Sequence, residues 1–505
     1  MASFILRRLF AAALVLFAAT FIMYLLVAYS GDPLKELYES QAPNKEALIE
    51  ARSDLLNLDV PPILRYFLWL GGVVHGDFGY TVQGLSVNEV LANAAASTIQ
   101  LVTAAEIIAI VIGLIVGIAT ALRQYSGFDY SITFLAFLFF SLPVFWVAVL
   151  LKQYGAIAFN DWLAEPTISV PVTIGLALLS GFLWMSILGG PPKRRWLTFG
   201  VATAATAAIL VFFDLTQWFA TPSIGIVGVA ATAVGAAFLV TAVSTGLRQR
   251  RTLYGALITA GIGVALYYPM LTLVFPMMSW PLLIALAILA VVVGGLVGWF
   301  IGGNHRAASA RTSAITAFLV AGVLALEGYL VWWSAYANAS RIGGRPIATV
   351  GSQTPSLGGN FWIQGIDTFT HLLLPTIAIV LISIASLSRY ARASMLEVLG
   401  QDYIRTAKAK GLSGRTVVVR HGLRNALIPV MTIIAMDIGA LIGGAVITEQ
   451  VFGWKGMGQL FVQGVRSVDP NPVMAFFLVT GILAVLFNLI ADLLYASLDP
   501  RIRVS

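Results

Sequence analysis

Three acidic residues lie inside strongly apolar segments and are the first candidates for chemistry. Asp437 stands near the middle of VMTIIAMDIGALIGG, Glu106 lies in the segment 99–122, and Glu327 lies in 314–335. An unpaired carboxylate in hydrocarbon costs several kcal/mol. We therefore expect Asp437 either to line a polar pathway or to hydrogen-bond a neighbouring helix. For Glu106 and Glu327 an interior hydrogen bond is favoured over a proton relay, because the acids do not form the repeated chain that a proton pump needs.

The sequence contains none of the short motifs that mark common hydrolytic sites. It has no G-x-x-x-x-G-K-[ST] phosphate loop, no G-x-S-x-G elbow and no H-E-x-x-H zinc site. It has no cysteines, and its four histidines are scattered without the spacing of metal ligands. We therefore expect no catalytic residue, no metal site and no cofactor bound by this chain. A transporter, channel, receptor or assembly subunit is favoured over an enzyme.

Composition predicts an all-α, polytopic membrane protein. Of the 505 residues 59% are hydrophobic and only 10% are charged, which is typical of a chain whose solvent is lipid. The net charge of +7 is explained by Lys and Arg in cytoplasmic loops, so no nucleic-acid partner is predicted. Twelve apolar segments are long enough to span a membrane: 9–29, 99–122, 130–151, 173–189, 197–214, 223–246, 253–275, 281–303, 314–335, 371–388, 427–448 and 473–496.

The basic clusters between these segments predict their orientation. If Arg7 and Arg8 are inside, every second loop is cytoplasmic, and each short basic cluster falls in such a loop. We therefore predict that both termini are cytoplasmic and that the protein lies in the cell (inner or plasma) membrane. The cytoplasmic segments are 123–129, 190–196, 247–252, 304–313, 389–426 and the tail with Arg501 and Arg503.

A shift in composition divides the chain into three parts. From about 173 to 336 the spans consist mostly of Ala, Val, Leu, Gly and Ile, joined by short basic turns. This pattern predicts an inserted block of about six helices, 152–345, between the parts 1–151 and 346–505. The number of inserted spans is even, so three spans remain on each side with unchanged topology. Glycines four residues apart, such as Gly294 and Gly298, predict close helix packing.

The longest charged stretch between two apolar segments is 389–429. It holds eight Lys or Arg residues and two acids, too many charges for a membrane span. Gly411 is typical of a helix end, and Ser413 is typical of the cap of a second helix that runs into Pro429. The stretch therefore predicts a charged helix–turn–helix at the membrane surface, where a partner docks.

Several stretches carry a family resemblance. The stretch DYIRTAKAKGLSGRTVVVRHGLRNALIP resembles the cytoplasmic loop of ABC-importer permeases of the dipeptide/oligopeptide/nickel family. Arg405-Thr406-Ala407 stands where the general importer signature has Glu-Ala-Ala, and this variant resembles the peptide subfamily. Further matching stretches follow in family order within 1–150 and 370–505: GDP from Gly31, GDFGYT, Ser141-Leu142-Pro143-Val144-Phe145, HLLLP from His371, E-x-V-F-x-x-x-G-x-G from Glu449 to Gly458, and the tail DLLYASLDPRIR.

The resemblance implies a six-helix, type I importer permease core and a role as one permease subunit of an ATP-driven importer of peptides. It implies a second homologous permease, two ATP-binding subunits that use ATP and Mg²⁺, an extracytoplasmic substrate-binding protein and surrounding membrane lipid. The coupling helix that meets an ATPase is expected at 401–411, with Asp402, Tyr403, Arg405, Thr406, Ala407, Lys408, Ala409, Lys410 and Gly411. Asp437, Ser141 and Pro143 are expected along the translocation path, and Glu449, Phe452, Trp454, Gly456 and Gly458 at an outer gate or binding-protein contact.

Two alternatives remain open at this point. Twelve spans with both termini inside is also a common arrangement of secondary, ion-coupled transporters, although the two halves show no evident repeat. Within the importer family the cargo is alternatively nickel or another small solute. For the inserted helices, a lipid-facing belt is the first expectation and a share in the substrate path the second.

Overall fold

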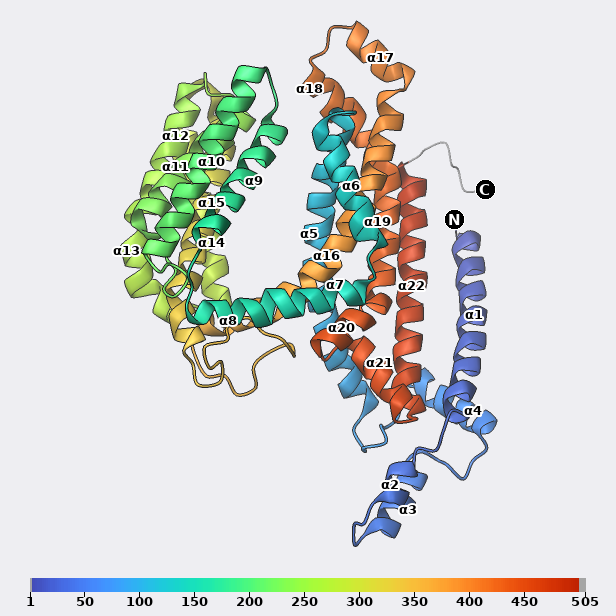
Figure 1. Ribbon diagram of the computed structural model, residues 1–505. Helices are drawn as coiled ribbons and strands as arrows, with labels where there is room; N and C mark the ends of the chain where they lie inside the picture. Colours follow the sequence, from blue (N-terminus) through green and yellow to red (C-terminus); the bar gives the residue numbers. More distant parts are fainter. Residues whose placement is uncertain (1, 499–505) are drawn as a thin grey trace. The chain divides into compact units, whose positions relative to one another are not determined.

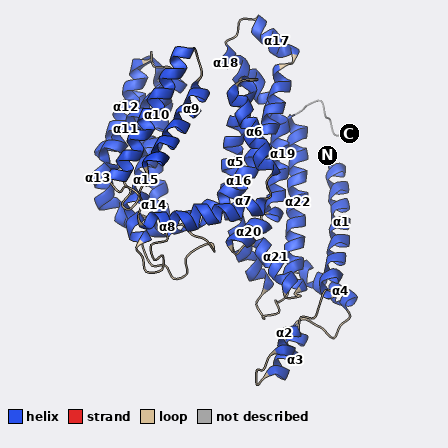
Figure 2. Ribbon diagram, viewed as in Figure 1, coloured by secondary structure: helices blue, strands red, loops and turns tan. Residues whose placement is uncertain are grey.

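A computed structural model describes the backbone of residues 2–498 and the side chains of residues 6–414, 416–439 and 445–491. Within that range Figure 2 shows helices and loops only. The predicted all-α fold is confirmed. The predicted cytoplasmic tail with Arg501 and Arg503 lies outside the described residues.

The chain divides into two compact units. Unit 1 contains residues up to Gly155, Thr349–Ser352 and the chain from Leu372 onward, and unit 2 contains Ala156–Ala348 and Gln353–His371. Two helices belong to both units, the π-helix η1 (Leu151–Ala158) and the long α16 (Phe361–Leu399). The predicted inserted block, 152–345, lies almost entirely in unit 2. Its status as an insertion into a permease core stays a prediction.

The long helices of unit 1 are α1, α5, α16, α19 and α22 (Figure 1). Short helices α17 and α18 lie at one end of this unit, and α4, α20 and α21 lie at the opposite end. Its elements are α1 (Ala2–Ala28), α2 (Lys35–Glu39), α3 (Lys45–Leu55), α4 (Pro62–Val74), α5 (Val87–Leu122), α6 (Gly127–Ser141), α7 (Val144–Leu150), α17 (Asp402–Ala409), α18 (Gly414–Thr416), η5 (Val417–Leu423), α19 (Arg424–Gly444), α20 (Val446–Phe452), α21 (Met457–Arg466) and α22 (Pro470–Leu498).

Unit 2 contains a helical hairpin, α9 with α10, and a bundle of α11, α12, α14 and α15 (Figure 1). Its elements are α8 (Phe159–Ala164), α9 (Val170–Leu188), α10 (Pro192–Leu215), α11 (Gly225–Ser244), α12 (Arg250–Ala265), α13 (Tyr267–Pro269), the π-helix η2 (Met270–Val274), the 3₁₀-helix η3 (Phe275–Met277), α14 (Trp280–Ile301), the 3₁₀-helix η4 (Gly303–His305) and α15 (Arg306–Ala337).

Ten helices within the described residues are long and apolar enough to cross a membrane, or twelve if each of two bent pairs is one span. The first bent pair covers the predicted span 130–151, which is divided into two helices. Helix α6 ends at Ser141, and the helix that begins at Val144 turns away by 102°. Leu142 is extended, with φ −81° and ψ 131°, because the ring of Pro143 disfavours helical backbone in the residue before it.

Glycines allow the closest helix contacts in both units, as predicted. A Cβ added to Gly117 of α5 would lie 2.6 Å from the carbonyl oxygen of Ser388 in α16. In unit 2, a Cβ on Gly298 of α14 would lie 2.4 Å from the carbonyl oxygen of Ser309 in α15. Because real Cβ atoms do not approach so closely, alanine at either position would force the helices apart.

Candidate functional site

Helix α17 occupies the middle of the basic stretch 389–429 and is anchored on one side. Ile404 and Ala407 are buried and pack with Val417 of η5, and the partly buried Val398 and Leu399 complete this cluster. The remaining predicted coupling residues are on the accessible side: Asp402, Tyr403, Arg405, Thr406, Lys408, Ala409, Lys410 and Gly411. Ala407 is therefore the one predicted coupling residue whose side chain faces its own chain and not the accessible side.

The end of α17 has the predicted form. Gly411 has a φ of +73°, in the left-handed region that glycine adopts without strain, and it follows the last helical turn directly. Ser413 accepts a hydrogen bond from the backbone N–H of Thr416 at 3.3 Å and so caps α18. The helix that Ser413 caps reaches Pro429, as predicted, and continues past it. It begins as α18, continues as the π-helix η5 and then as α19, which contains Pro429.

The base of α16, just before α17, is tied to α6 by an ion pair that sequence reasoning missed. The Arg392 guanidinium donates from Nε to Oδ1 of Asp129 at 2.9 Å and from Nη2 to Oδ2 at 3.0 Å. The backbone N–H of Tyr125 donates to the same carboxylate at 3.0 Å. Asp129 is almost fully buried. This bidentate ion pair fixes the orientation of α16 relative to α6 more firmly than a single hydrogen bond does.

A second contact closes the basic loop onto the start of α19. The side-chain amide of Asn425 donates to the Tyr403 hydroxyl at 2.9 Å, and Ser394 of α16 donates to the carbonyl oxygen of Ala426 at 2.7 Å. Together with the Ile404 anchor, these bonds connect α17 to the two long helices α16 and α19.

The predicted path residues do not form one cluster. Asp437 is half-buried on α19, whereas Ser141 and Pro143 are exposed at the break after α6. The Ser141 hydroxyl donates to the carbonyl oxygen of Leu138 at 2.8 Å, a bond within its own helix. These positions leave all three side chains outside the tightly packed core, and their place along a path stays a prediction.

Glu106 differs from its predicted role. It is buried on α5, and neither carboxyl oxygen has a hydrogen-bond partner among the described residues. Asp437 lies near enough for its charge to act on Glu106. The sequence favoured an interior hydrogen bond for this side chain, and within the part of the chain that the structure describes that bond is absent.

Glu327, in unit 2, does form the predicted interior hydrogen bonds. Its buried carboxylate accepts from the hydroxyls of Ser223 at 2.6 Å and Tyr267 at 2.8 Å, and from the backbone N–H of Ile224 at 2.7 Å. The Glu327 carboxylate therefore accepts a hydrogen bond from a backbone N–H group that would otherwise be unpaired at the start of α11, where the helix dipole stabilises a negative charge. This explains why α15 carries an acid in an apolar segment.

The stretch from Glu449 to Gly458 is a helix cap rather than a surface contact. The Glu449 carboxylate accepts from the backbone N–H of Gly458 at 2.7 Å and of Gln459 at 3.1 Å, at the start of α21. Thr98 of α5 donates to its other oxygen at 2.6 Å and accepts from the backbone N–H of Met457 at 2.8 Å. Three N–H groups at the N-terminus of α21 are thereby satisfied by side chains from α20 and α5.

The two glycines of this stretch make room for the carboxylate. A Cβ on Gly456 would lie 2.4 Å from Oε1 of Glu449, and a Cβ on Gly458 would lie 2.9 Å from Oε2 and 2.5 Å from the Cα of Val446. Burial raises the pKa of Glu449 above its ordinary value, while the hydrogen bonds from Thr98, Gln459 and Gly458 act in the opposite direction. The spacing of the motif therefore follows from the geometry of the cap.

The side chains of Glu449, Phe452 and Trp454 are fully or almost fully buried. The Trp454 indole N–H donates to the carbonyl oxygen of Ser97 in α5 at 3.1 Å. Because these three side chains are enclosed by their own chain, they are not on the surface of this structure, and their contact with a binding protein stays a prediction. An outer gate formed by α20 and α21 as whole helices stays a prediction.

Residues 255–504 match the family described as "Binding-protein-dependent transport system inner membrane component". The chain is 42% identical over 188 residues to the oligopeptide transport system permease protein OppB of Mycobacterium bovis, covering 37% of this chain and 56% of that protein. It is 49% identical over 137 residues to the oligopeptide transport system permease protein AppB of Bacillus subtilis, covering 27% and 43%.

A third relative is the dipeptide transport system permease protein DppB of Escherichia coli. The two are 38% identical over 205 residues, which is 36% of this chain and 59% of DppB. The chain therefore spans about half the length of the curated relatives it matches.

Proposed function

We propose that this chain is one permease subunit of an ATP-driven importer of peptides, because its residues 255–504 match the family of binding-protein-dependent transport system inner membrane components and its relatives are peptide permeases. It is a multi-pass protein of the cell membrane. The proposed assembly contains a second homologous permease, two ATP-binding subunits that use ATP and Mg²⁺, and an extracytoplasmic binding protein. The names of the relatives, which are oligopeptide and dipeptide permeases, support peptides as cargo over nickel or another small solute.

The accessible face of α17 is the observation that carries this proposal. It presents Arg405, Lys408 and Lys410 next to the small Ala409, while Ile404 holds the opposite face. In the proposed mechanism an ATP-binding subunit docks on this face. Closure of the two ATP-binding subunits moves α17 as a rigid lever, because its anchor and the neighbouring hydrogen bonds do not allow it to move alone.

The same contacts suggest how the movement reaches the long helices of unit 1. The Asp129–Arg392 ion pair joins α6 to α16, and Asn425 and Ala426 join the loop to α19. We propose that α16, α19 and α6 turn together between inward-open and outward-open states, with the path formed against the second permease. In this arrangement Asp437 on α19 and Ser141 at the end of α6 are the polar residues proposed to face the cargo.

Unit 2 has a different proposed role. Helix α10 has no buried residue, and only two residues of α9 are buried, so most of the surface of this hairpin is apolar and exposed. We propose that the helices of unit 2 form a lipid-facing belt.

Uptake in proteoliposomes tests the function. The purified permease pair, its ATP-binding subunits and its binding protein should import a labelled di- or oligopeptide only when ATP is supplied on the side of the ATP-binding subunits. A proton gradient without those subunits should drive no uptake. Uptake driven by the gradient alone would instead support the secondary transporter and refute the importer.

Two alanines on α17 give a matched test of the docking face. Ala409→Leu adds bulk on the accessible side, so transport per ATP hydrolysed should fall while the chain folds normally. Ala407→Leu adds the same bulk inside the Ile404 cluster and should lower thermal stability instead. If Ala409→Leu leaves both ATP hydrolysis stimulated by binding protein and peptide uptake unchanged, α17 is not the docking element.

Gly411 supplies an independent variant at the end of the same helix. Its added Cβ meets no atom within 4 Å, but its φ of +73° disfavours any other residue by about 1 kcal/mol or more. Gly411→Val should therefore distort the exit of α17 and uncouple ATP hydrolysis from transport while the complex still assembles. Unchanged transport stimulated by the binding protein would remove this assignment.

A further inference from the structure

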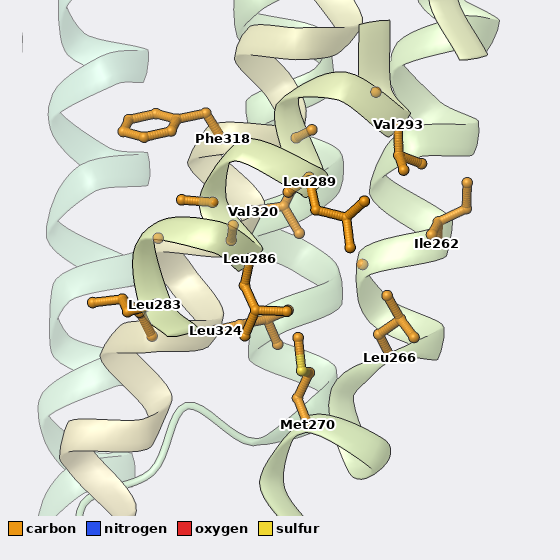
Figure 3. Close-up of a pocket in the computed structure, with 18 of the residues that line it drawn as sticks. Ile262, Leu266, Met270, Leu283, Leu286, Leu289, Val293, Phe318, Val320 and Leu324 are labelled. Atoms are coloured by element: carbon orange, nitrogen blue, oxygen red, sulfur yellow. The ribbon is translucent and has the colours of Figure 1, made fainter. Parts of the chain in front are cut away.

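Unit 2 contains an apolar cavity of about 340 Å³ between α12, α14 and α15 (Figure 3). Figure 3 shows side chains from these three helices and from η2 converging on it. The larger residues that line it are Leu266, Met270, Leu286, Leu289, Phe318 and Leu324.

The cavity has a local cause in the backbone. The span that begins with α12 bends by 44° where α13 follows Ala265, so its second half diverges from the first. On the other side, α14 and α15 are held together by the glycine contact at Gly298. The intervening wall carries small residues, including Gly263, Ala290 and Gly322, which do not fill the space. The cavity therefore results from a bend beside a close helix pair.

The lining offers an occupant no polar partner. Thr259 is the only lining residue with a polar side-chain atom other than the Met sulfurs, and its hydroxyl already donates to the carbonyl oxygen of Gly255 at 2.9 Å. A peptide placed here would leave its amide groups without hydrogen bonds, at a cost of several kcal/mol. Water is disfavoured for the same reason. The cavity therefore suits a hydrocarbon and does not suit the proposed cargo.

The cavity opens on the lateral surface of the spanning helices. Its rim residues Leu266, Leu289 and Phe318 are 43%, 57% and 57% exposed, and α14 and α15 are long enough to cross a membrane. In a membrane, that surface is covered by lipid acyl chains. Because the cavity continues this apolar surface inward, we propose that it binds an acyl chain of a membrane phospholipid, which fills the gap left by the bend.

Two glycine substitutions test the proposal with a matched control. Gly322 lines the cavity and Gly261 does not, yet both lie exposed on helices of one bundle, and an added Cβ at either meets no atom within 4 Å. Gly322→Leu places a side chain in the cavity, whereas Gly261→Leu adds the same side chain outside it. Ala290→Leu, from α14, serves as a second cavity-filling variant.

The probe is a phosphatidylglycerol or phosphatidylethanolamine with a diazirine in one acyl chain, incorporated into vesicles with the assembled complex. After illumination, crosslinks should concentrate in 259–270 and 283–294, and both cavity-filling variants should lower that yield by about tenfold, whereas Gly261→Leu should not. Mass spectrometry of lipid retained on the purified complex should find a phospholipid that the filling variants lose. Crosslinks spread equally over α9 and α10, yields unchanged by both filling variants, or retention of an isoprenoid instead would each overturn the proposal.

Discussion

Replacing Glu449 with glutamine removes the acceptor that holds the N-terminus of α21. In the native chain one oxygen accepts two backbone N–H groups, of Gly458 and Gln459, and the other accepts the Thr98 hydroxyl. An amide has one oxygen and one NH₂ group, so either the Thr98 hydroxyl or the two backbone N–H groups lose their acceptor. The loss of the charge-assisted hydrogen bonds and the unsatisfied donor should together lower the local stability of this segment by about 2–4 kcal/mol.

Hydrogen exchange measures this loss directly. The amides of Gly458 and Gln459 should exchange at least about 30-fold faster in Glu449→Gln, because each 1.4 kcal/mol of lost local stability is about tenfold in the opening equilibrium. The thermal unfolding midpoint should fall as well. Glu397→Gln is the matched control, since Glu397 is exposed and loses the same charge. Exchange in 446–466 that is unchanged, or equally accelerated by the control, would refute the capping role.

Three further substitutions address other contacts. Asp129→Asn breaks the buried ion pair with Arg392, and we expect a stability loss of about 3–5 kcal/mol in thermal unfolding; Asp129→Arg combined with Arg392→Asp should recover part of it, and no recovery would argue against pairing. Glu327→Ala should accelerate exchange at the start of α11, because the hydroxyls of Ser223 and Tyr267 and the backbone N–H of Ile224 lose their acceptor. Burial raises the pKa of Asp469 from 3.8 to about 6. Between these two pH values the native state binds more protons than the unfolded state, so the free energy of unfolding falls as pH rises from 3.8 to about 6, by about 3 kcal/mol at most. Asp469→Asn should remove this fall when unfolding is compared at pH 4 and pH 7, and an unchanged pH dependence would contradict the assignment.

Apolar length predicted the helical type and the positions of the spans, but it did not predict that two of the twelve, including 130–151, are bent pairs of helices. The segment 130–151 is apolar throughout, so length and composition give no reason to divide it. The bend depends on Pro143, and prolines inside spans are often accommodated without a break, as Pro375 is in α16. Whether such a proline bends or breaks a helix is decided by the neighbouring helices, which a local pattern does not contain.

Partners far apart in the sequence were beyond prediction for a similar reason. Asp129 and Arg392 are 263 residues apart, and each alone looks like an ordinary charge in a loop. Glu327 was easier, because an acid in an apolar helix requires hydrogen bonds wherever it lies. Its donors, Ser223 and the N–H of Ile224, are common groups without a distinctive pattern. The need for a partner was predictable, and the identity of the partner was not.

The motifs that carry the resemblance contain both buried residues and accessible residues. Glu449 and Trp454 are enclosed by their own chain, so their types are explained by the cap of α21 and by packing on α5. Ala407 is enclosed in the same way by η5. A motif position therefore does not by itself indicate contact with a partner. For this chain the docking surface has to be sought among the motif residues that remain accessible, and on α17 these are the charged side chains around Lys408 and the small Ala409.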